Sequence, residues 1–279
     1  NFIINKKSAV KICKYIIIIN FIVILLQINN ILGGFTSVRY YDPGTDFLSR
    51  PFGLTGGSWE IGAIMSICFF IIYQYDEKKF NFEILIYLLI VLWILYLCQT
   101  RGTIFAFILT LFFLINSNLI RLILLLVLLA GIAFYFPSND FLNKITKLDP
   151  SYMLKNFIFF LYNGFANEEM YLKSYYYSLA QRLDHISSSY ILWKSNISTI
   201  LFGIGFEKIY MDSFYLRILI SFGLIGFCLV GILSLIYMPF IMILFLGVAG
   251  VTLDHIFSIK IFALTIIYIH LYKNFKNEK

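Results

Sequence analysis

Long apolar runs recur along this chain and alternate with short polar segments. Most of the runs approach the roughly 20 residues that an α-helix needs to cross the hydrocarbon core of a bilayer. The pattern predicts an all-α protein, a polytopic membrane helix bundle with about eight spans. The expected spans are residues 15–32, 59–75, 84–98, 103–116, 119–136, 213–237, 240–253 and 257–271.

Lysines at the ends of these runs predict how the bundle is oriented. Lysines precede the first span, follow the second span and close the chain. Positive residues concentrate on the cytoplasmic side of membrane proteins, so both termini are expected in the cytoplasm. The lysines that carry this argument are Lys6, Lys7, Lys11, Lys14, Lys78, Lys79, Lys273, Lys276 and Lys279.

Polar sequence collects in two loops on the opposite, extracytoplasmic side. The loop at residues 33–58 ends in a cluster of glycines, which predicts a re-entrant or substrate-facing turn. The loop at residues 137–212 is rich in tyrosine and is expected to hold helices that lie on the membrane surface. The chain therefore divides into residues 1–136, 137–212 and 213–279.

Composition narrows the classes of function. The 279 residues are 60% hydrophobic, more than the roughly half that is typical of soluble domains. The net charge of +7 comes without a basic helix face or a recognition motif, so no nucleic-acid partner is expected. Part of the charge anchors helix ends, and the rest suggests an anionic ligand on the outer side. No metal-binding or nucleotide-binding motif is present, so neither metal nor cofactor is expected.

Arg101 stands at the tip of a hairpin between two short spans and is expected at membrane depth. An arginine there is costly unless it reaches water or an anion. It could snorkel to lipid headgroups, or its planar guanidinium could bind phosphate in an outward cavity. Arg182 also has two interpretations, a surface salt bridge to Asp184 or anion binding.

Asp212 begins the span at residues 213–237. Asp is a favoured helix N-cap, so a structural role fits; the alternative is a carboxylate that orients or deprotonates a substrate hydroxyl. Arg50 and Arg217 could each pair with a nearby acid, and Arg217 could snorkel from the first turn of that span.

Four short segments form a pattern in chain order. They are Arg50-Pro-Phe-Gly-Leu-Thr-Gly-Gly57, then Gln99-Thr-Arg-Gly102, then Arg182 and Trp193 followed by Leu201-Phe-Gly-Ile-Gly-Phe206, and finally Asp212-Ser213 followed after nine residues by Gly223-Leu-Ile-Gly226. Together they resemble the O-antigen polymerase and O-antigen ligase superfamily of bacterial membrane glycosyltransferases. The resemblance runs from about residue 50 to residue 271, most of the chain.

The resemblance implies a metal-independent polymerase of undecaprenyl-diphosphate-linked repeat units, with a GT-C-like helical fold. Donor and acceptor glycans would meet at the outer face of the bacterial inner membrane, and the product would be O-antigen or capsule-type polysaccharide. A chain-length regulator and a flippase would be further partners. The expected catalytic residues are Arg101, Arg182 and Asp212, and the expected substrate-binding residues are Arg50, Trp193, Glu207 and Arg217.

Two departures from the family pattern matter. The ligase pattern has histidine where this chain has Asp212, which favours polymerase over ligase and leaves the identity of the base open. The chain has fewer spans than the family usually shows and does not begin with Met, so upstream sequence is expected. A flippase for the same lipid-linked glycan and an assembly subunit are the alternatives, but the sequence shows no repeated halves.

Overall fold

The computed structural model describes residues 5–29, 31, 38–39, 49–76, 82–98, 101–115, 188–205, 213–250 and 258–277. The chain divides into two compact units, Asn1–Phe107 with Ser234–Lys279, and Ile108–Leu233. Within the described ranges the secondary structure is helical except for one short pair of strands. The expectation of an all-α fold therefore holds for this part of the chain.

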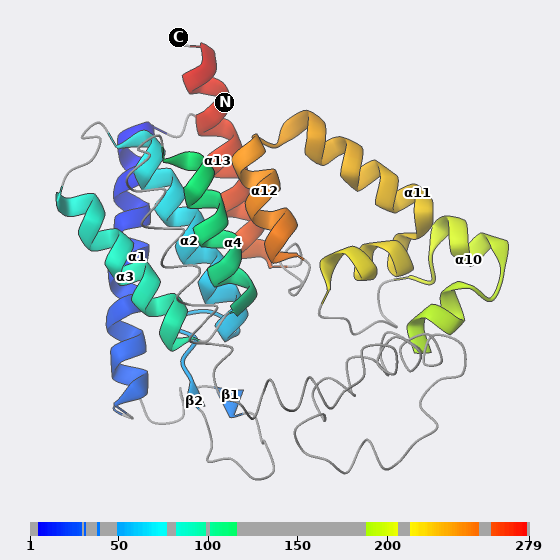
Figure 1. Ribbon diagram of the computed structural model, residues 1–279, viewed down its shortest axis with the longest axis horizontal. Coiled ribbons are helices and arrows are strands. Elements are labelled where there is room, and N and C mark those ends of the chain that lie inside the picture. The colour runs from blue at the N-terminus through cyan, green and yellow to red at the C-terminus, as the bar shows by residue number, and fades with distance from the viewer. Residues whose placement is uncertain are drawn as a thin grey trace, which may run out of the picture. The chain divides into compact units, whose positions relative to one another are not determined.

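The first unit is built around α2 (Ser58–Tyr75). This helix packs against α1 (Lys6–Ile28), α3 (Phe82–Leu97) and α13 (Ile259–Asn277) (Figure 1). Every residue of α2 from 60 to 72 is buried. A helix that is apolar on all sides is typical of a protein core or a membrane span, and α2 lies at the centre of this bundle.

Aromatic side chains join two more helices to this core. The ring of Phe70 in α2 stacks on Phe107 of α4 (Arg101–Leu114), with centroids 5.4 Å apart. It also meets Phe245 of α12 (Phe240–Ala249) edge-on, at 5.2 Å. Offset and edge-on ring pairs of this kind add to the stabilisation that burial alone provides.

Polar contacts show the direction of the helices in this unit. Lys14, early in α1, pairs with Asp76, directly after α2. Ser258, directly before α13, donates a hydrogen bond to Glu60 in the first turn of α2. Consequently α1 runs antiparallel to α2 and α13 runs parallel to it, and the start of α1 shares one end of the unit with the end of α13.

Large apolar side chains cover the outer faces of the first unit's helices. Soluble monomers rarely expose contiguous apolar surface of this kind, which is typical of contact with lipid or another protein. Two helices of the described chain, Lys6–Ile28 and Phe214–Tyr237, are long and apolar enough to cross a membrane. The exposed residues include Ile12, Ile18, Ile19, Ile22 and Leu25 of α1, Leu85, Ile86, Leu89, Trp93 and Tyr96 of α3, and Phe262 and Ile266 of α13.

The helix bounds agree with the expected spans in some places and differ in others. α2, α3 and α4 begin and end within two residues of the expected positions. α1 begins at Lys6 instead of residue 15, because Asn5 caps it and lysine is a good helix former. α13 continues to Asn277 instead of residue 271, because Lys273 and Lys276 are compatible with a helix. The expected span at residues 119–136 lies outside the described residues, and the count of about eight spans stays a prediction.

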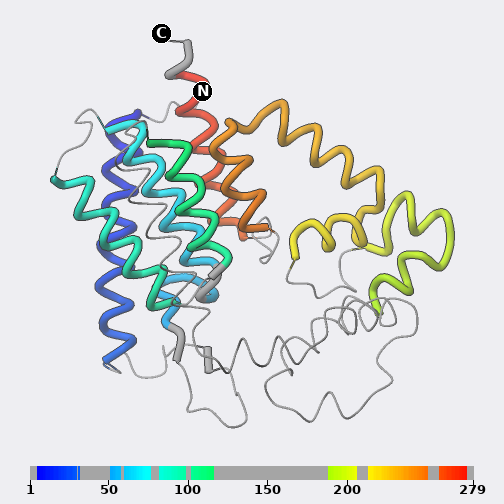
Figure 2. The backbone as a smooth tube through the Cα atoms, viewed as in Figure 1, coloured from blue at the N-terminus to red at the C-terminus, as the bar shows by residue number. Residues whose placement is uncertain are grey.

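The second unit contains α10 (Ile197–Phe202) and most of α11 (Phe214–Tyr237). Asn196 caps α10, accepting a hydrogen bond from the Thr199 backbone N–H, while the Thr199 hydroxyl bonds back to the Asn196 backbone. α11 has the expected bounds but is broken at Gly223, where φ is 68° (Figure 2). The expectation of one continuous helix here was wrong.

A short hairpin precedes α2 in the first unit. β1 (Val38–Arg39) pairs antiparallel with β2 (Ser49–Arg50), and Val38 lies opposite Arg50. The sequence pattern did not predict these strands, which are two residues long each.

Candidate functional site

A tight loop at residues 51–57 lies between β2 and α2, and the side chains of α1 hold it. The Gln27 side-chain oxygen accepts hydrogen bonds from the backbone N–H groups of Phe52, at 3.1 Å, and Gly53, at 2.9 Å. The Gln27 amide nitrogen donates to the Gly53 carbonyl at 3.1 Å. Asn20 accepts from the Leu54 N–H at 2.9 Å. Two buried amides therefore fix the first half of the 51–57 loop to α1.

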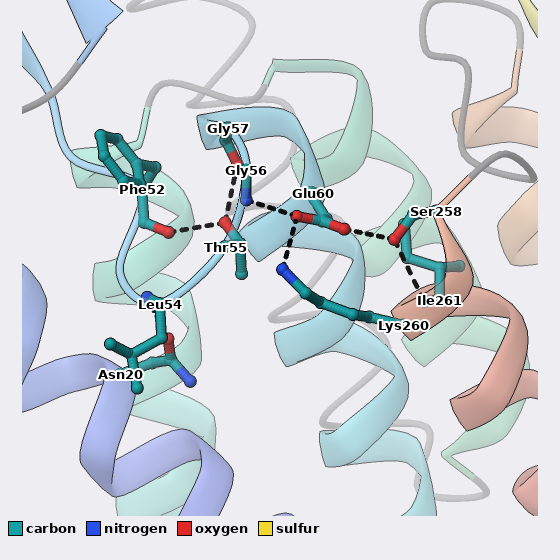
Figure 3. A network of polar contacts seen from close by, with 10 residues as sticks. All are labelled: Asn20, Phe52, Leu54, Thr55, Gly56, Gly57, Glu60, Ser258, Lys260 and Ile261. Carbon is teal, nitrogen blue, oxygen red and sulfur yellow. Dashed lines mark hydrogen bonds and ion pairs between the residues drawn. The ribbon is translucent and has the colours of Figure 1, made fainter.

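Glu60 holds the second half of the loop (Figure 3). Its carboxylate accepts hydrogen bonds from the Gly56 N–H at 2.6 Å and from the Ser258 hydroxyl. It also pairs with the Lys260 ammonium at 3.3 Å. Glu60 is only 6% exposed, so this pairing and hydrogen bonding offsets the cost of removing its charge from water. Segments almost 200 residues apart in sequence meet at this carboxylate.

Two residues inside the loop make its tight path possible. Gly53 has a φ of 59°, and a Cβ at this position would lie 2.6 Å from Oδ1 of Asn20. The Thr55 hydroxyl lies 2.6 Å from the Phe52 carbonyl oxygen and 3.0 Å from that of Gly57. The glycine permits the turn, and the threonine closes the loop on itself.

Arg50 directly precedes this loop, at the end of β2. Its backbone is restricted twice, by pairing with the β1 strand and by the Pro51 ring that follows. The side chain of Arg50 lies outside what is described. The structure thus fixes the backbone position of one expected substrate-binding residue.

Acidic residues occupy the other end of the same unit, around Lys14. The Lys14 ammonium lies 2.7 Å from a carboxylate oxygen of Asp76 and 2.7 Å from one of Glu83. We call this the lysine end, and the end with the 51–57 loop, Glu60 and Lys260 the loop end. The first unit therefore carries a polar network at each end, buried at the loop end and partly exposed at the lysine end.

In the second unit, two glycine-containing segments cross in direct backbone contact. The Ile204 N–H donates to the Ile220 carbonyl at 3.0 Å, and the Gly205 N–H donates to the Ser221 carbonyl at 3.1 Å. A Cβ on Gly203 would overlap the Ser221 backbone, and one on Gly223 would overlap the Leu201 backbone. We call this contact of residues 201–205 with 220–223 the glycine crossing.

The glycine crossing also explains the break in α11. At the break, the carbonyl groups of Ile220 and Ser221 accept hydrogen bonds from outside the helix. The crossing joins two of the segments that carry the family resemblance, the Gly-x-Gly run and the glycine that follows Asp212. One backbone contact in this chain therefore accounts for the glycines of both segments.

Trp193 and Arg217, both expected to bind substrate, lie in the second unit. Trp193 packs against Ile220, as do Ile204 and Leu216, so its indole supports the glycine crossing. The indole Nε1 is buried and has no hydrogen-bond partner among the described residues. Arg217 lies in α11 before the break and is partly buried.

The remaining expected site residues are only partly described or not at all. Arg101 is the first residue of α4 in the first unit, and its side chain lies outside what is described. Arg182, Glu207 and Asp212 lie outside the described residues. That Arg101, Arg182 and Asp212 meet in one cavity therefore stays a prediction.

Sequence reasoning missed the polar network of the loop end. Its members interrupt apolar runs, which is costly unless they are hydrogen-bonded. A search for polar residues inside the expected spans would have found all five: Asn20, Gln27, Glu60, Ser258 and Lys260.

Among the described residues, no group of three or more His, Cys, Asp or Glu side chains is placed to hold a metal ion. No protein-family model, curated protein or solved structure matches this chain. A functional proposal therefore depends on the segments quoted above and on how the structure arranges them.

Proposed function

We propose that this chain is a membrane glycosyltransferase of the O-antigen polymerase and ligase superfamily. It would polymerise undecaprenyl-diphosphate-linked repeat units into O-antigen or capsule-type polysaccharide at the outer face of the bacterial inner membrane. The observation that carries the proposal is the glycine crossing, in which two of the resembling segments are in backbone contact. If the resemblance were due to chance, the glycines of these two segments would not be expected on both sides of one backbone contact.

The proposed chemistry needs fixed positive charge and one proton acceptor. The hydroxyl oxygen of the acceptor sugar attacks the anomeric carbon of the donor and forms a new C–O bond there. The bond between that carbon and the lipid diphosphate breaks. The electron pair leaves with the diphosphate, and guanidinium groups stabilise the charge that develops there. In the proposal Arg101 and Arg182 bind the diphosphate, and Asp212 orients the hydroxyl or takes its proton.

A membrane location is the second part of the proposal. The first unit exposes apolar side chains along α1, α3 and α13, and its polar side chains collect at its two ends. This is the distribution that a bilayer favours, with an apolar band between polar ends. The lysine end would face the cytoplasm and the loop end the opposite side.

One observation favours a flippase as the second candidate. Transporters commonly use broken membrane helices whose free backbone groups bind substrate or ions. α11 is broken at Gly223, although the crossing segment already satisfies the carbonyl groups of Ile220 and Ser221.

The glycans of cells that lack the gene separate these functions. Without a polymerase, single repeat units still reach the lipid acceptor and the polymer ladder collapses to its lowest band. Without a flippase, no repeat unit reaches the outer face. Without a ligase, long polymer accumulates on the undecaprenyl carrier. We expect the single-unit band, restored to a full ladder by the wild-type gene; either of the other patterns contradicts the polymerase proposal.

A further inference from the structure

Five polar side chains hold the seven-residue loop at residues 51–57. Gln27 and Asn20 hold it from α1, Glu60 holds it from α2, and Ser258 and Lys260 secure Glu60 from the start of α13. All five lie within the expected spans, where polar side chains are costly unless paired. Buried polar networks that are fully hydrogen-bonded fix a single geometry more strictly than apolar packing does.

The bonding of Glu60 argues against a role as a base. One carboxylate oxygen accepts from Ser258, and the other accepts from the Gly56 N–H and pairs with Lys260. A general base needs a free oxygen within reach of the proton that it removes. Glu60 is therefore placed to hold its neighbours rather than to react.

Two cationic residues depend on this network. Lys260 is 53% exposed at its side chain, and its ammonium pairs with Glu60 at 3.3 Å. Arg50 is attached directly to the 51–57 loop, so the loop sets the backbone position from which its side chain extends. Both residues belong to the loop end.

We propose that Glu60 and Gln27 are positioning residues that hold Lys260 and Arg50 to bind the diphosphate of a lipid-linked substrate. Glu60 acts on Lys260 directly and on Arg50 through the loop, and Gln27 acts on Arg50 through the loop alone. The inference rests on the proposed function, because that function supplies the diphosphate. It adds Lys260, with its positioning partners, to the residues that the family resemblance implies.

Binding of farnesyl diphosphate to the purified full chain in detergent micelles tests the inference. Gln27→Leu removes three hydrogen bonds to the loop, and we expect it to weaken binding roughly tenfold. Thr55→Val is the milder variant should Gln27→Leu fail to fold. Lys260→Met should weaken binding, whereas Lys14→Met, the matched lysine of the other end, should leave it unchanged.

Dependence on Arg50 separates positioning from mere support of the fold. In an Arg50→Ala background, Gln27→Leu should weaken binding no further, because the residue through which it acts is already gone. Equal weakening with and without Arg50 would overturn the inference. A general loss of folding would lower binding in both backgrounds and would not show this dependence.

The two substitutions at Glu60 complete the test. Gln at this position can still accept from the Gly56 N–H, and its amide can donate to the Ser258 hydroxyl. We therefore expect Glu60→Gln to keep binding within about twofold and to keep the polymer ladder, while Glu60→Ala weakens binding as Gln27→Leu does. Loss of the ladder in Glu60→Gln with binding intact would show a base and overturn the positioning role.

The two proposals fail in different ways in this experiment. If cells without the gene keep a full ladder, the proposed polymerase is wrong whatever the binding shows. If the ladder depends on the gene but binding is indifferent to Gln27, Lys260 and Arg50, the positioning inference alone is wrong.

Discussion

Glu60 illustrates, at the scale of single residues, how a charge is kept inside an apolar core. Its carboxylate is 6% exposed and is held by a hydroxyl, a backbone N–H and an ammonium group. Removing one partner of such a set leaves the others desolvated and costs about 1–3 kcal/mol for each unsatisfied group. Replacing any one member is therefore expected to destabilise the whole set, and the substitutions proposed above make use of this.

Gly53→Ala tests the turn that Gln27 and Asn20 hold. Alanine at a φ of 59° is strained, and its Cβ would lie 2.6 Å from the Asn20 oxygen that accepts from Leu54. We expect a loss of about 1–3 kcal/mol in the free energy of unfolding, seen as a lower midpoint of thermal unfolding in detergent.

Gly56→Ala is the matched control for Gly53→Ala. A Cβ on Gly56 would lie 3.4 Å from Glu60, an ordinary contact, and the N–H that bonds Glu60 is retained. A midpoint lowered as much by Gly56→Ala as by Gly53→Ala would show that the loop is not held as described.

Arg101 and Asp212 carry the proposed chemistry, and conservative substitutions separate their alternative roles. Lysine keeps the charge of Arg101 but not the planar fork, so Arg101→Lys should remove long polymer if the residue binds diphosphate bidentately. Asp212→Asn should remove it too, since an amide cannot take a proton, whereas Asn serves a helix cap as well as Asp does. The measurement is the polymer ladder beside the abundance of the protein in membranes. Full ladders from both variants would leave these residues with purely structural roles.

α11 is the element in which sequence and structure differ most. Its apolar run is unbroken, so it predicts one long span, yet the helix is interrupted at Gly223. The cause lies in another segment, since residues 201–205 bond to the helix's carbonyl groups at the break and would overlap a Cβ on residue 223. A hydrophobic pattern reports burial along one segment and contains no information about a crossing segment.

Three glycine substitutions test the crossing. Gly203→Ala and Gly223→Ala should each disrupt it, because the added Cβ overlaps backbone that cannot move aside and both residues have positive φ. Gly231→Ala, in the same helix, meets nothing within 4 Å and should be neutral or stabilise the helix by about 0.5–1 kcal/mol.

The polymer ladder and the abundance of the protein in membranes are the measurements for the crossing. Loss in Gly203→Ala and Gly223→Ala with Gly231→Ala unaffected supports the crossing as essential. A full ladder from Gly223→Ala would mean that α11 does not need its break.

Other elements were predictable because their ends carry local signals. Glycines precede α2 and Asp76 follows it, so the run between them has clear limits. The sequence pattern predicts too late a start for α1, because Lys6, Lys7, Lys11 and Lys14 have the charge typical of residues that flank a span, although lysine is compatible with a helix. The pairing of Glu60 with Ser258 and Lys260 was not predictable, since these two residues lie almost 200 residues from Glu60 in sequence and only the fold brings them together.

At the scale of the whole chain, the polar groups of the first unit define an axis. Lys14, Asp76 and Glu83 lie at one end, and Gln27, Glu60 and Ser258 lie at the other. Apolar side chains are exposed between them. If the unit crosses a membrane, its two ends must face different compartments, and the lysine excess predicts that the lysine end faces the cytoplasm.

Cysteine labelling with an impermeant maleimide tests this orientation. Cys228 is exposed and is first replaced by serine, whereas Cys13, Cys68 and Cys98 are buried and can stay. Leu54 is 61% exposed in the 51–57 loop, and Ser8 is exposed near the start of α1, so each accepts a single cysteine. Leu54→Cys should be labelled in intact spheroplasts, and Ser8→Cys only after lysis. Labelling of both variants only after lysis would place the loop end inside the cell, where a polymerase of exported glycan has no substrate. Labelling of Ser8→Cys alone in intact spheroplasts would invert the unit, and the loop end could then not bind a diphosphate presented at the outer face.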